Sequence, residues 1–344
     1  MKYVAIDVSS KSFVVHVIDR KKRLLFQGEI APVKTALLKL IEDLGPEPMK
    51  VVFEAGNQMK WLAETLQGVE KVDLHVVHPN ELKWISKSSS KTDKVDARKM
   101  AELARGDLLP RKVHIVEGPV RRLRELTSAR QTVQGKRIAL SNSIRALLLQ
   151  EGVRLSEKFF GRTDWRDRLD RVAVSDTGRI VITAYMQAID ALQETEAELT
   201  EQMVAVKDER LELLESIPGI GLLTSRVLLG ALDEAQRFDD RKAVAKYGAL
   251  TPTIYQSGAV THLGRINRDG RHEVRRVLLQ CAHTVARMKS FESRPLRQFF
   301  ERLMKRRGKK IAIVALARKL LTIAYGVLKN QAHYDPARLT PYPV

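Results

Sequence analysis

Four carboxylates occur where the sequence predicts a strand to end or a helix to begin. Asp7 lies in the run VAIDVSS, Glu54 follows VVF, and Asp93 and Asp96 open the helical pattern DKVDARKMAELAR. A helix places Asp93 and Asp96 on one side of its first turn, because residues at this spacing are neighbours on a helical surface. Carboxylate oxygens suit hard cations such as Mg2+. Together the four residues predict one site for divalent metal ions.

Each carboxylate taken singly also has a structural explanation. Asp7 could cap a turn, and Glu54 could pair with Lys60. Asp93 and Asp96 could favour a helix N-terminus electrostatically. Only the order of the four residues, their strand positions and their shared helical turn favour the metal site. Their order would reproduce the metal site of ribonuclease H-like folds, in which two magnesium ions activate a nucleophile and stabilise the leaving oxygen. Without nearby cysteines or clustered histidines, the pattern argues against zinc.

Ser257, in the run YQSG, is a second candidate for chemistry near the other end of the chain. A serine hydroxyl is a weak nucleophile, and a phosphoryl group needs its charge offset. A serine close to several cations therefore suits attack on a phosphodiester. The alternative is an ordinary turn residue before a glycine. The neighbouring cations are Arg265, Arg268, Arg271, Arg275 and Arg276.

The N-terminal elements that would position the carboxylates are α/β in pattern. Three β-rich runs within residues 1–30 predict an antiparallel meander, and helices then alternate with short apolar strands. This alternation predicts a partly parallel sheet, in which ligands collect beyond the strand ends. Residues 83–94 form a serine-rich basic loop, and a helix beginning near Asp93 ends at Gly106.

The middle of the chain predicts two long helices, over residues 119–150 and 177–213. Apolar residues recur at helical spacing in both segments. Two such helices would pair as an antiparallel hairpin or dimerise as a coiled coil. The imperfect heptads leave both possibilities open.

The C-terminal third contains the run Pro218-Gly219-Ile220-Gly221, a tight turn between two helices. It resembles a helix-hairpin-helix element, which grips a nucleic-acid backbone without reading its sequence. A plain turn between helices is the alternative. Residues 248–270, rich in glycine, predict loops and turns before a helix that starts near Arg271.

Composition indicates a nucleic-acid partner. The 344 residues include 60 Lys and Arg against 41 Asp and Glu, a formal net charge of +19. Such a surface attracts phosphates, whose neutralisation releases counterions. The basic residues are spread along the chain, and no apolar run approaches the roughly 18 residues of a membrane span, so we expect no membrane partner. The single cysteine, Cys281, predicts a buried small hydrophobe in a reducing cytoplasm.

Taken together, these motifs resemble the IS110 family of insertion-sequence transposases, which includes the related Piv-type DNA invertases. The front motifs are VAIDVSSKSF, FEAGN and SKTDKVDARKMAELAR. The back motifs are IPGIG, YQSG and GRINRDGRHEVRRVL. The resemblance covers nearly the full chain.

The resemblance implies an α/β plus α architecture. Residues 1–112 would form a RuvC-like domain of the ribonuclease H-like fold, 113–206 a long helical coiled-coil arm, and 207–344 a mainly α transposase domain with a helix-hairpin-helix element. The DEDD tetrad falls on Asp7, Glu54, Asp93 and Asp96, and the catalytic serine on Ser257.

The same resemblance implies how the protein acts. Members recombine donor and target DNA through a 5′-phosphoserine link with a Mg2+-binding tetrad. They are homo-oligomers, dimers or tetramers, whose active site combines two subunits, and a noncoding guide RNA pairs with both DNAs. We expect a bacterial cytoplasmic protein, associated with the nucleoid when bound to DNA. The expected backbone contacts are Lys91, Lys94, Arg98, Gly219, Gly221, Arg265, Arg268 and Arg271.

Other functions fit parts of the same pattern. A RuvC-like metal-dependent nuclease would use water and leave Ser257 structural, and a site-specific DNA invertase would use the same chemistry as a transposase. A nonenzymatic DNA- or RNA-binding protein would use the acids structurally. The AIDVSSKS strand and turn also resembles a sugar-kinase-like ATPase, but no phosphate-binding glycine loop follows it.

Overall fold

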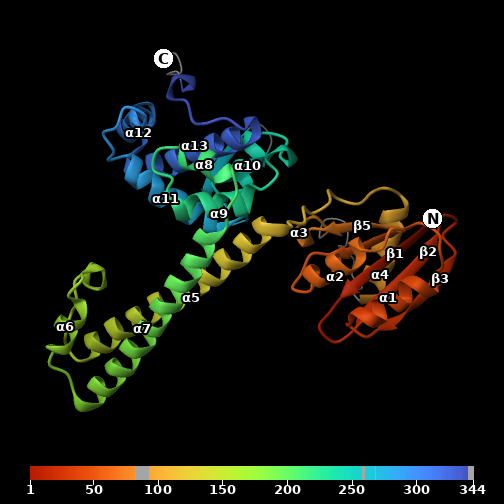
Figure 1. Ribbon diagram of the computed structural model, residues 1–344, viewed down its shortest axis with the longest axis horizontal. Coiled ribbons are helices and arrows are strands. Elements are labelled where there is room, and N and C mark those ends of the chain that lie inside the picture. Colours follow the sequence, from red (N-terminus) through yellow and green to blue (C-terminus); the bar gives the residue numbers. More distant parts are fainter. Residues whose placement is uncertain (83–92, 258–259, 268, 340–344) are drawn as a thin grey trace. The chain divides into compact units, whose positions relative to one another are not determined.

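The computed structural model describes residues 1–82, 93–257, 260–267 and 269–339, without the side chains of residues 93, 254–257, 260–261 and 263 (Figure 1). The chain divides into two compact units, Met1–Ile115 and Val116–Val344. The first unit is a mixed α/β layer structure, and the second consists mainly of helices. Separating the second unit into an arm and a C-terminal domain stays a prediction.

The first unit is built on one five-stranded sheet. Strands β1, β2 and β3 form the predicted antiparallel meander, and β4 and β5 run parallel to β1. The sheet order is β3-β2-β1-β4-β5. The strands are β1 (Lys2–Val8), β2 (Phe13–Asp19), β3 (Leu24–Ile30), β4 (Met49–Glu54) and β5 (Val72–Val77).

Helices cover both faces of this sheet. Helices α1 (Lys34–Asp43) and α2 (Met59–Gln67) pack on the face that presents Ile6 and Phe53. Helix α4 (Asp93–Arg105) packs on the opposite face, and α3 (Pro79–Leu82) precedes it. Successive side chains of a strand point to opposite faces of the sheet, so helices on both faces bury both sets of side chains in the central strands. The continuous apolar runs of these strands predict this arrangement.

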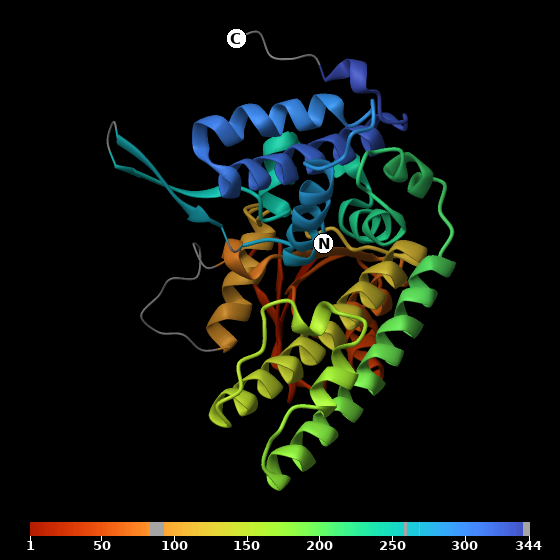
Figure 2. The same ribbon diagram turned by 90° about the vertical axis from the view of Figure 1, so that its left-hand side faces the viewer.

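A helical hairpin of α5 (Gly118–Gln150) and α7 (Asp176–Ala205) begins the second unit (Figure 2). The two helices run antiparallel within the chain, as one of the two predicted arrangements requires. At the closed end, η1 (Phe159–Gly161) and α6 (Trp165–Asp170) pack with the helices in a small apolar cluster. Dimerisation through these helices stays a prediction.

The predicted extent of the second long helix, to residue 213, was wrong. Helix α7 ends at Ala205, and Val206 adopts an extended backbone with φ −69° and ψ 120°. The buried Arg226 explains this end, since its Nε and Nη2 donate to the carbonyls of Met203 and Val204 at 2.8 and 2.9 Å. Carbonyls at a helix end need such donors. The apolar periodicity continues in the separate helix α8 (Arg210–Glu215).

Helix α13 (Lys309–Asn330) is the central helix of the remaining body. Its residues Leu316, Leu320 and Leu321 are fully buried in the largest apolar cluster. Around it pack α8, η2 (Ala235–Arg237), α10 (Arg241–Tyr247), α11 (His272–Val285) and α12 (Arg294–Arg307). The same unit contains α9 (Leu222–Leu232) and η3 (Pro336–Arg338). Cys281 is buried in the same cluster, as predicted, and burial raises the pKa of its thiol.

By length and composition alone, α13 could cross a membrane, with a mean hydropathy of 1.9 over its most apolar window. This corrects the expectation that no segment would reach that length. The sequence hides the segment because Arg318 and Lys319 interrupt its apolar residues. Its burial in the second unit is typical of a core helix.

Residues 248–270 also differ from their prediction as loops and turns. Strands β6 (Pro252–Ser257) and β7 (Val260–Ile266) form an antiparallel hairpin that extends from the helices of its unit (Figure 2). The runs PTIYQS and VTHLGRI contain β-branched and aromatic residues, which favour strands. Glycines drew the prediction toward loops, although hairpins use glycine as well. Helix α11 begins after Arg271, as expected.

Candidate active site

Asp7 and Glu54 lie at neighbouring positions on the sheet. The parallel register of β1 and β4 pairs Ala5 with Val52 and Ile6 with Phe53, and the next residues are Asp7 and Glu54. Ala5 and Val52 face α4. Because strand side chains alternate, Asp7 and Glu54 face the same way, two residues further along each strand. The sheet therefore brings these two carboxylates to one edge of one face.

Contacts along α4 set its direction across this face. The ion pair between Lys50 and Asp107, at 3.4 Å, holds the end of the helical segment near the start of β4. Asp96 to Asp107 spans about 16 Å of helix, and Lys50 to Glu54 spans about 13 Å of strand. The first turn of α4, with Asp96, therefore lies near the strand ends that present Asp7 and Glu54.

Asp96 has an unusual environment for a carboxylate. Among the described residues, its buried Oδ1 has no hydrogen-bond partner. A buried carboxylate oxygen without a partner is costly, and a cation would satisfy it. Asp93 begins α4, but its side chain is outside the described part.

The carboxylates are chemically suitable metal ligands, although the described ones do not form a complete site. Among the described residues, no three His, Cys, Asp or Glu side chains are close enough together to hold a metal ion. The described members Asp7, Glu54 and Asp96 supply hard oxygen ligands on one side of the sheet, which suits magnesium. A closed site would need the fourth carboxylate or a small movement of α4.

His16 is a further polar residue on this face that the sequence analysis did not select. It pairs with Ala5 across β1 and β2 and is buried, and in the described part its Nδ1 has no hydrogen-bond partner. Burial lowers its pKa, and the charge of Arg98 adds to this effect. His16 is therefore neutral near pH 7. The only sequence signal was a histidine in the apolar run FVVHVID.

Ser257 is the last residue of β6 and pairs with Val260 across the hairpin. It belongs to the second unit, and the carboxylates belong to the first. Its side chain is outside the described part. The backbone thus places this serine at the end of a projecting hairpin, where a large substrate could reach it.

The predicted nucleic-acid contacts differ in their surroundings. Lys94, Arg98 and Arg265 are exposed, as a backbone contact requires, whereas Lys91 and Arg268 lie outside the described residues. Arg271 is half-buried and forms an ion pair with Glu273. A phosphate would therefore compete with Glu273 for Arg271.

The turn between α8 and α9 gives its two glycines different roles. Gly219 has φ +82°, and a Cβ built there would lie 2.6 Å from Cγ2 of Val285 in α11. The missing side chain therefore allows close packing inside the unit. Gly221 is exposed, precedes α9, and has open space at its Cβ position. A phosphate contact from this turn stays a prediction, with Gly221 the better-placed residue.

Gly219→Ala is expected to destabilise the protein by about 2–4 kcal/mol, because the new methyl group combines a positive φ with overpacking. Gly221→Ala is the matched control and should change stability by less than about 1 kcal/mol. Thermal unfolding measures both. A Gly219→Ala protein that unfolds like wild type but binds DNA poorly would contradict the packing role.

Comparison with known proteins identifies the class as a transposase, because two parts of the chain match models of one transposase family. Residues 4–152 match the IS110 DEDD domain model, described as a transposase. Residues 211–298 match the model described as the IS116/IS110/IS902 transposase family. The chain belongs to this IS110 family of transposases, which confirms the resemblance in its motifs.

Individual relatives include both inverting proteins and transposases. A pilin gene-inverting protein of Moraxella bovis is 37% identical over 37% of this chain, and the match spans only 39% of that relative. A probable family 20 transposase of Pseudomonas aeruginosa is 23% identical over 97% of this chain and 98% of its own length. The transposase of IS1111A from Coxiella burnetii is 26% identical over 61% of this chain and 59% of its own.

Proposed function

We propose that the protein is a magnesium-dependent DNA recombinase of an insertion sequence, which cuts and exchanges strands through a serine nucleophile. The observation that carries this proposal is the position of Asp7 and Glu54 on the face of the sheet that α4, with Asp96, covers. Asp7 and Glu54 occupy neighbouring strand ends, and α4 carries the unpartnered oxygen of Asp96 toward them. Membership of a transposase family supports DNA as the substrate of these carboxylates.

The first unit is proposed to be a RuvC-like domain of the ribonuclease H-like fold. The supporting observation is its sheet order β3-β2-β1-β4-β5, with an antiparallel meander followed by two parallel strands. This topology places the ends of β1 and β4 side by side. Carboxylates on those two strands thereby become neighbours although they are far apart in the sequence.

In the proposed reaction, Asp7, Glu54, Asp93 and Asp96 hold the ions and orient the scissile phosphate. Magnesium, when bound, would supply charge neutralisation at the phosphate and at the leaving oxygen. The Oγ of Ser257 forms a bond to phosphorus as the bond to the 3′ oxygen breaks. The serine proton passes, directly or through water, to the leaving 3′ oxygen, which is released as a hydroxyl. The resulting 5′-phosphoserine conserves the free energy of the broken phosphodiester bond, so the DNA can later be joined to another strand.

The remaining parts of the proposal follow from the family resemblance. A noncoding guide RNA would select donor and target DNA, so that the protein contacts mainly backbones. The homo-oligomer would assemble one active site from the first unit of one subunit and Ser257 of another. The positive charge and the exposed Lys94, Arg98 and Arg265 support backbone contacts. A cytoplasmic location, without a membrane partner, belongs to the same proposal.

A recombination assay tests this proposal. The protein is expressed with the noncoding segment beside its gene, and plasmids carrying donor and target sites report strand exchange. Joined products are expected with wild type, and Asp7→Asn should give none, because one metal ligand is lost. Cut DNA without joined products would instead support a metal-dependent nuclease.

A site-specific DNA invertase is the second candidate. It is favoured by the pilin gene-inverting relatives, which are more than a third identical over the aligned part. The same plasmids distinguish the two functions. Inversion of a segment between two sites on one plasmid, without transfer to a second plasmid, would favour the invertase.

A further inference from the structure

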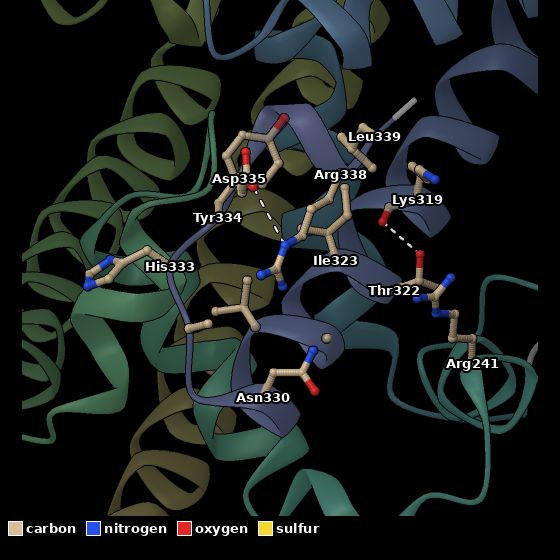
Figure 3. Close-up of a pocket in the computed structure, with 13 residues that line it drawn as sticks. Arg241, Lys319, Thr322, Ile323, Asn330, His333, Tyr334, Asp335, Arg338 and Leu339 are labelled. Atoms are coloured by element: carbon tan, nitrogen blue, oxygen red, sulfur yellow. Dashed lines mark hydrogen bonds and ion pairs between the residues drawn. The ribbon is translucent and has the colours of Figure 1, made fainter. Parts of the chain in front are cut away.

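The second unit contains a cavity of about 480 Å³ that neither the carboxylates nor Ser257 use (Figure 3). Three segments line it: the start of α10, the second half of α13, and the chain that follows α13. A volume in this range is typical of small-molecule sites, which occupy about 300–1,000 Å³. The cavity is therefore large enough for a nucleotide.

The lining is strongly basic. The basic residues of the lining are Arg241, Lys319, His333 and Arg338, and its one acid, Asp335, pairs with Arg338 at 3.5 Å (Figure 3). Among the described residues, the side chains of Arg241 and Lys319 have no acidic partner. Burial and the nearby charge of Arg241 lower the pKa of Lys319. A bound anion between these cations would offset the repulsion between their charges.

Gly326 opens the cavity on the side of α13. It lies inside this long helix, where glycine costs about 1 kcal/mol relative to alanine. A Cβ built there meets no atom within 4 Å, so no neighbour in the described part requires the glycine. Gly326 lines the cavity. Its missing methyl group therefore provides space for a ligand at a cost in helix stability.

The wall opposite α13 is fixed before any ligand binds. The backbone N–H of Tyr334 donates to Oγ of Ser216 at 2.9 Å, and the Tyr334 hydroxyl donates to the carbonyl of Glu292 at 3.0 Å. The aromatic ring of Tyr334 lies in the lining together with the apolar side chains of Ile323 and Val327. Aromatic and apolar surface of this kind suits a nucleobase.

We propose that this cavity binds a nucleoside 5′-phosphate, with the phosphate at Arg241 and Lys319 and the base against Tyr334 and the open side of Gly326. The combination of a basic end and an aromatic, apolar wall matches the two halves of such a ligand. The same chemistry is present in a free nucleotide and at the 5′-phosphorylated end of a strand. The inference concerns the second unit and does not depend on recombination.

Binding of AMP to the full-length protein, measured by calorimetry, tests the proposal. Saturable binding is expected, with adenosine at least about tenfold weaker because it lacks the charge-assisted contacts. Lys319→Met should weaken AMP at least about tenfold, and Lys310→Met, which removes a charge from the same helix outside the cavity, should not. Absence of AMP binding at about 1 mM, or equal effects of both variants, would overturn the proposal.

Two glycine variants separate ligand binding from helix stability. Gly326→Ala should raise or preserve the melting temperature and weaken AMP binding at least about tenfold. Gly135→Ala, at another interior helix position with open space, should raise the melting temperature and leave AMP binding unchanged. If Gly326→Ala bound AMP like wild type, the glycine would not serve a ligand and the cavity assignment would fail.

Oligonucleotides then identify the natural source of the ligand. Displacement of AMP by a strand with a 5′-phosphate, and not by the same strand with a 5′-hydroxyl, would assign the cavity to strand ends. If AMP binds but neither strand displaces it, the ligand is a free nucleotide. Both results support the proposed chemistry, and displacement by both strands alike would contradict a phosphate-directed site.

Discussion

Ser257→Ala is expected to abolish the covalent protein–DNA adduct and all strand exchange, while DNA binding stays near the wild-type level. Only the Oγ of this residue is proposed to bond to phosphorus, so its loss removes the intermediate itself. We expect a fall in recombination of at least about 10³-fold, since covalent catalysis has no substitute nucleophile at this position. Denaturing gels of protein trapped on labelled DNA measure the adduct.

Thr253→Val is the matched control for this experiment. Thr253 is in the same strand, β6, and its hydroxyl donates to the carbonyl of Arg265 at 3.1 Å across the hairpin. Its loss should cost about 1 kcal/mol of stability and leave the adduct intact. If Ser257→Ala still formed an adduct that survives denaturant, another residue would be the nucleophile. If wild type cut DNA without any adduct, the water-dependent nuclease would be favoured.

Asp96→Asn is expected to reduce DNA cleavage at least about 100-fold, because metal-ion catalysis contributes several kcal/mol to a phosphoryl transfer. The substitution should also change the melting temperature, which is measured independently of activity. Without metal, the variant should melt at a higher temperature than wild type, since a neutral amide costs less to bury without a partner than a charged carboxylate does. Added magnesium should stabilise wild type and not the variant.

Controls for this prediction lie on the same sheet. Glu54→Gln should also lose cleavage and the magnesium-dependent stabilisation, because its strand end neighbours Asp7. Asp73→Asn changes an exposed acid of β5 beside Lys50, at the other end of the sheet, and should change neither property. Differential scanning fluorimetry with EDTA or MgCl2 measures the effect. Equal stabilisation of wild type and Asp96→Asn by magnesium would rule out Asp96 as a ligand.

The sequence predicted the sheet better than the hairpin of the second unit. Apolar runs such as VAIDV and VVFE are buried on both sides in the structure, so their pattern was a direct consequence of their environment. Strands β6 and β7 form a hairpin, but the glycines among their residues favoured loops and obscured it. The end of α7 was missed because the contact that terminates it comes from Arg226, far along the chain.

The sequence indicated the members of the candidate site, which stay a prediction, but it did not indicate their geometry. Strand ends and helical spacing indicated Asp7, Glu54 and Asp96, but the register that makes Asp7 and Glu54 neighbours depends on the pairing of β1 with β4. The unpartnered oxygen of Asp96 and the buried His16 depend on how α4 packs on the sheet, which no local pattern reveals. No local pattern explained Gly326 inside its helix, because its proposed role depends on the cavity beside it.

The helical hairpin has a mechanical consequence. Its two ends are held by apolar clusters, whereas in these fully described helices α5 buries no residue between Thr127 and Ile144. In that interval Glu196 joins the helices by binding both Arg130, at 2.8 Å, and Arg137, at 3.1 Å. Apolar packing at the two ends of the hairpin and an ionic contact in its middle respond to different conditions. We therefore expect removal of Glu196 to loosen the middle of the hairpin and to leave its two ends packed.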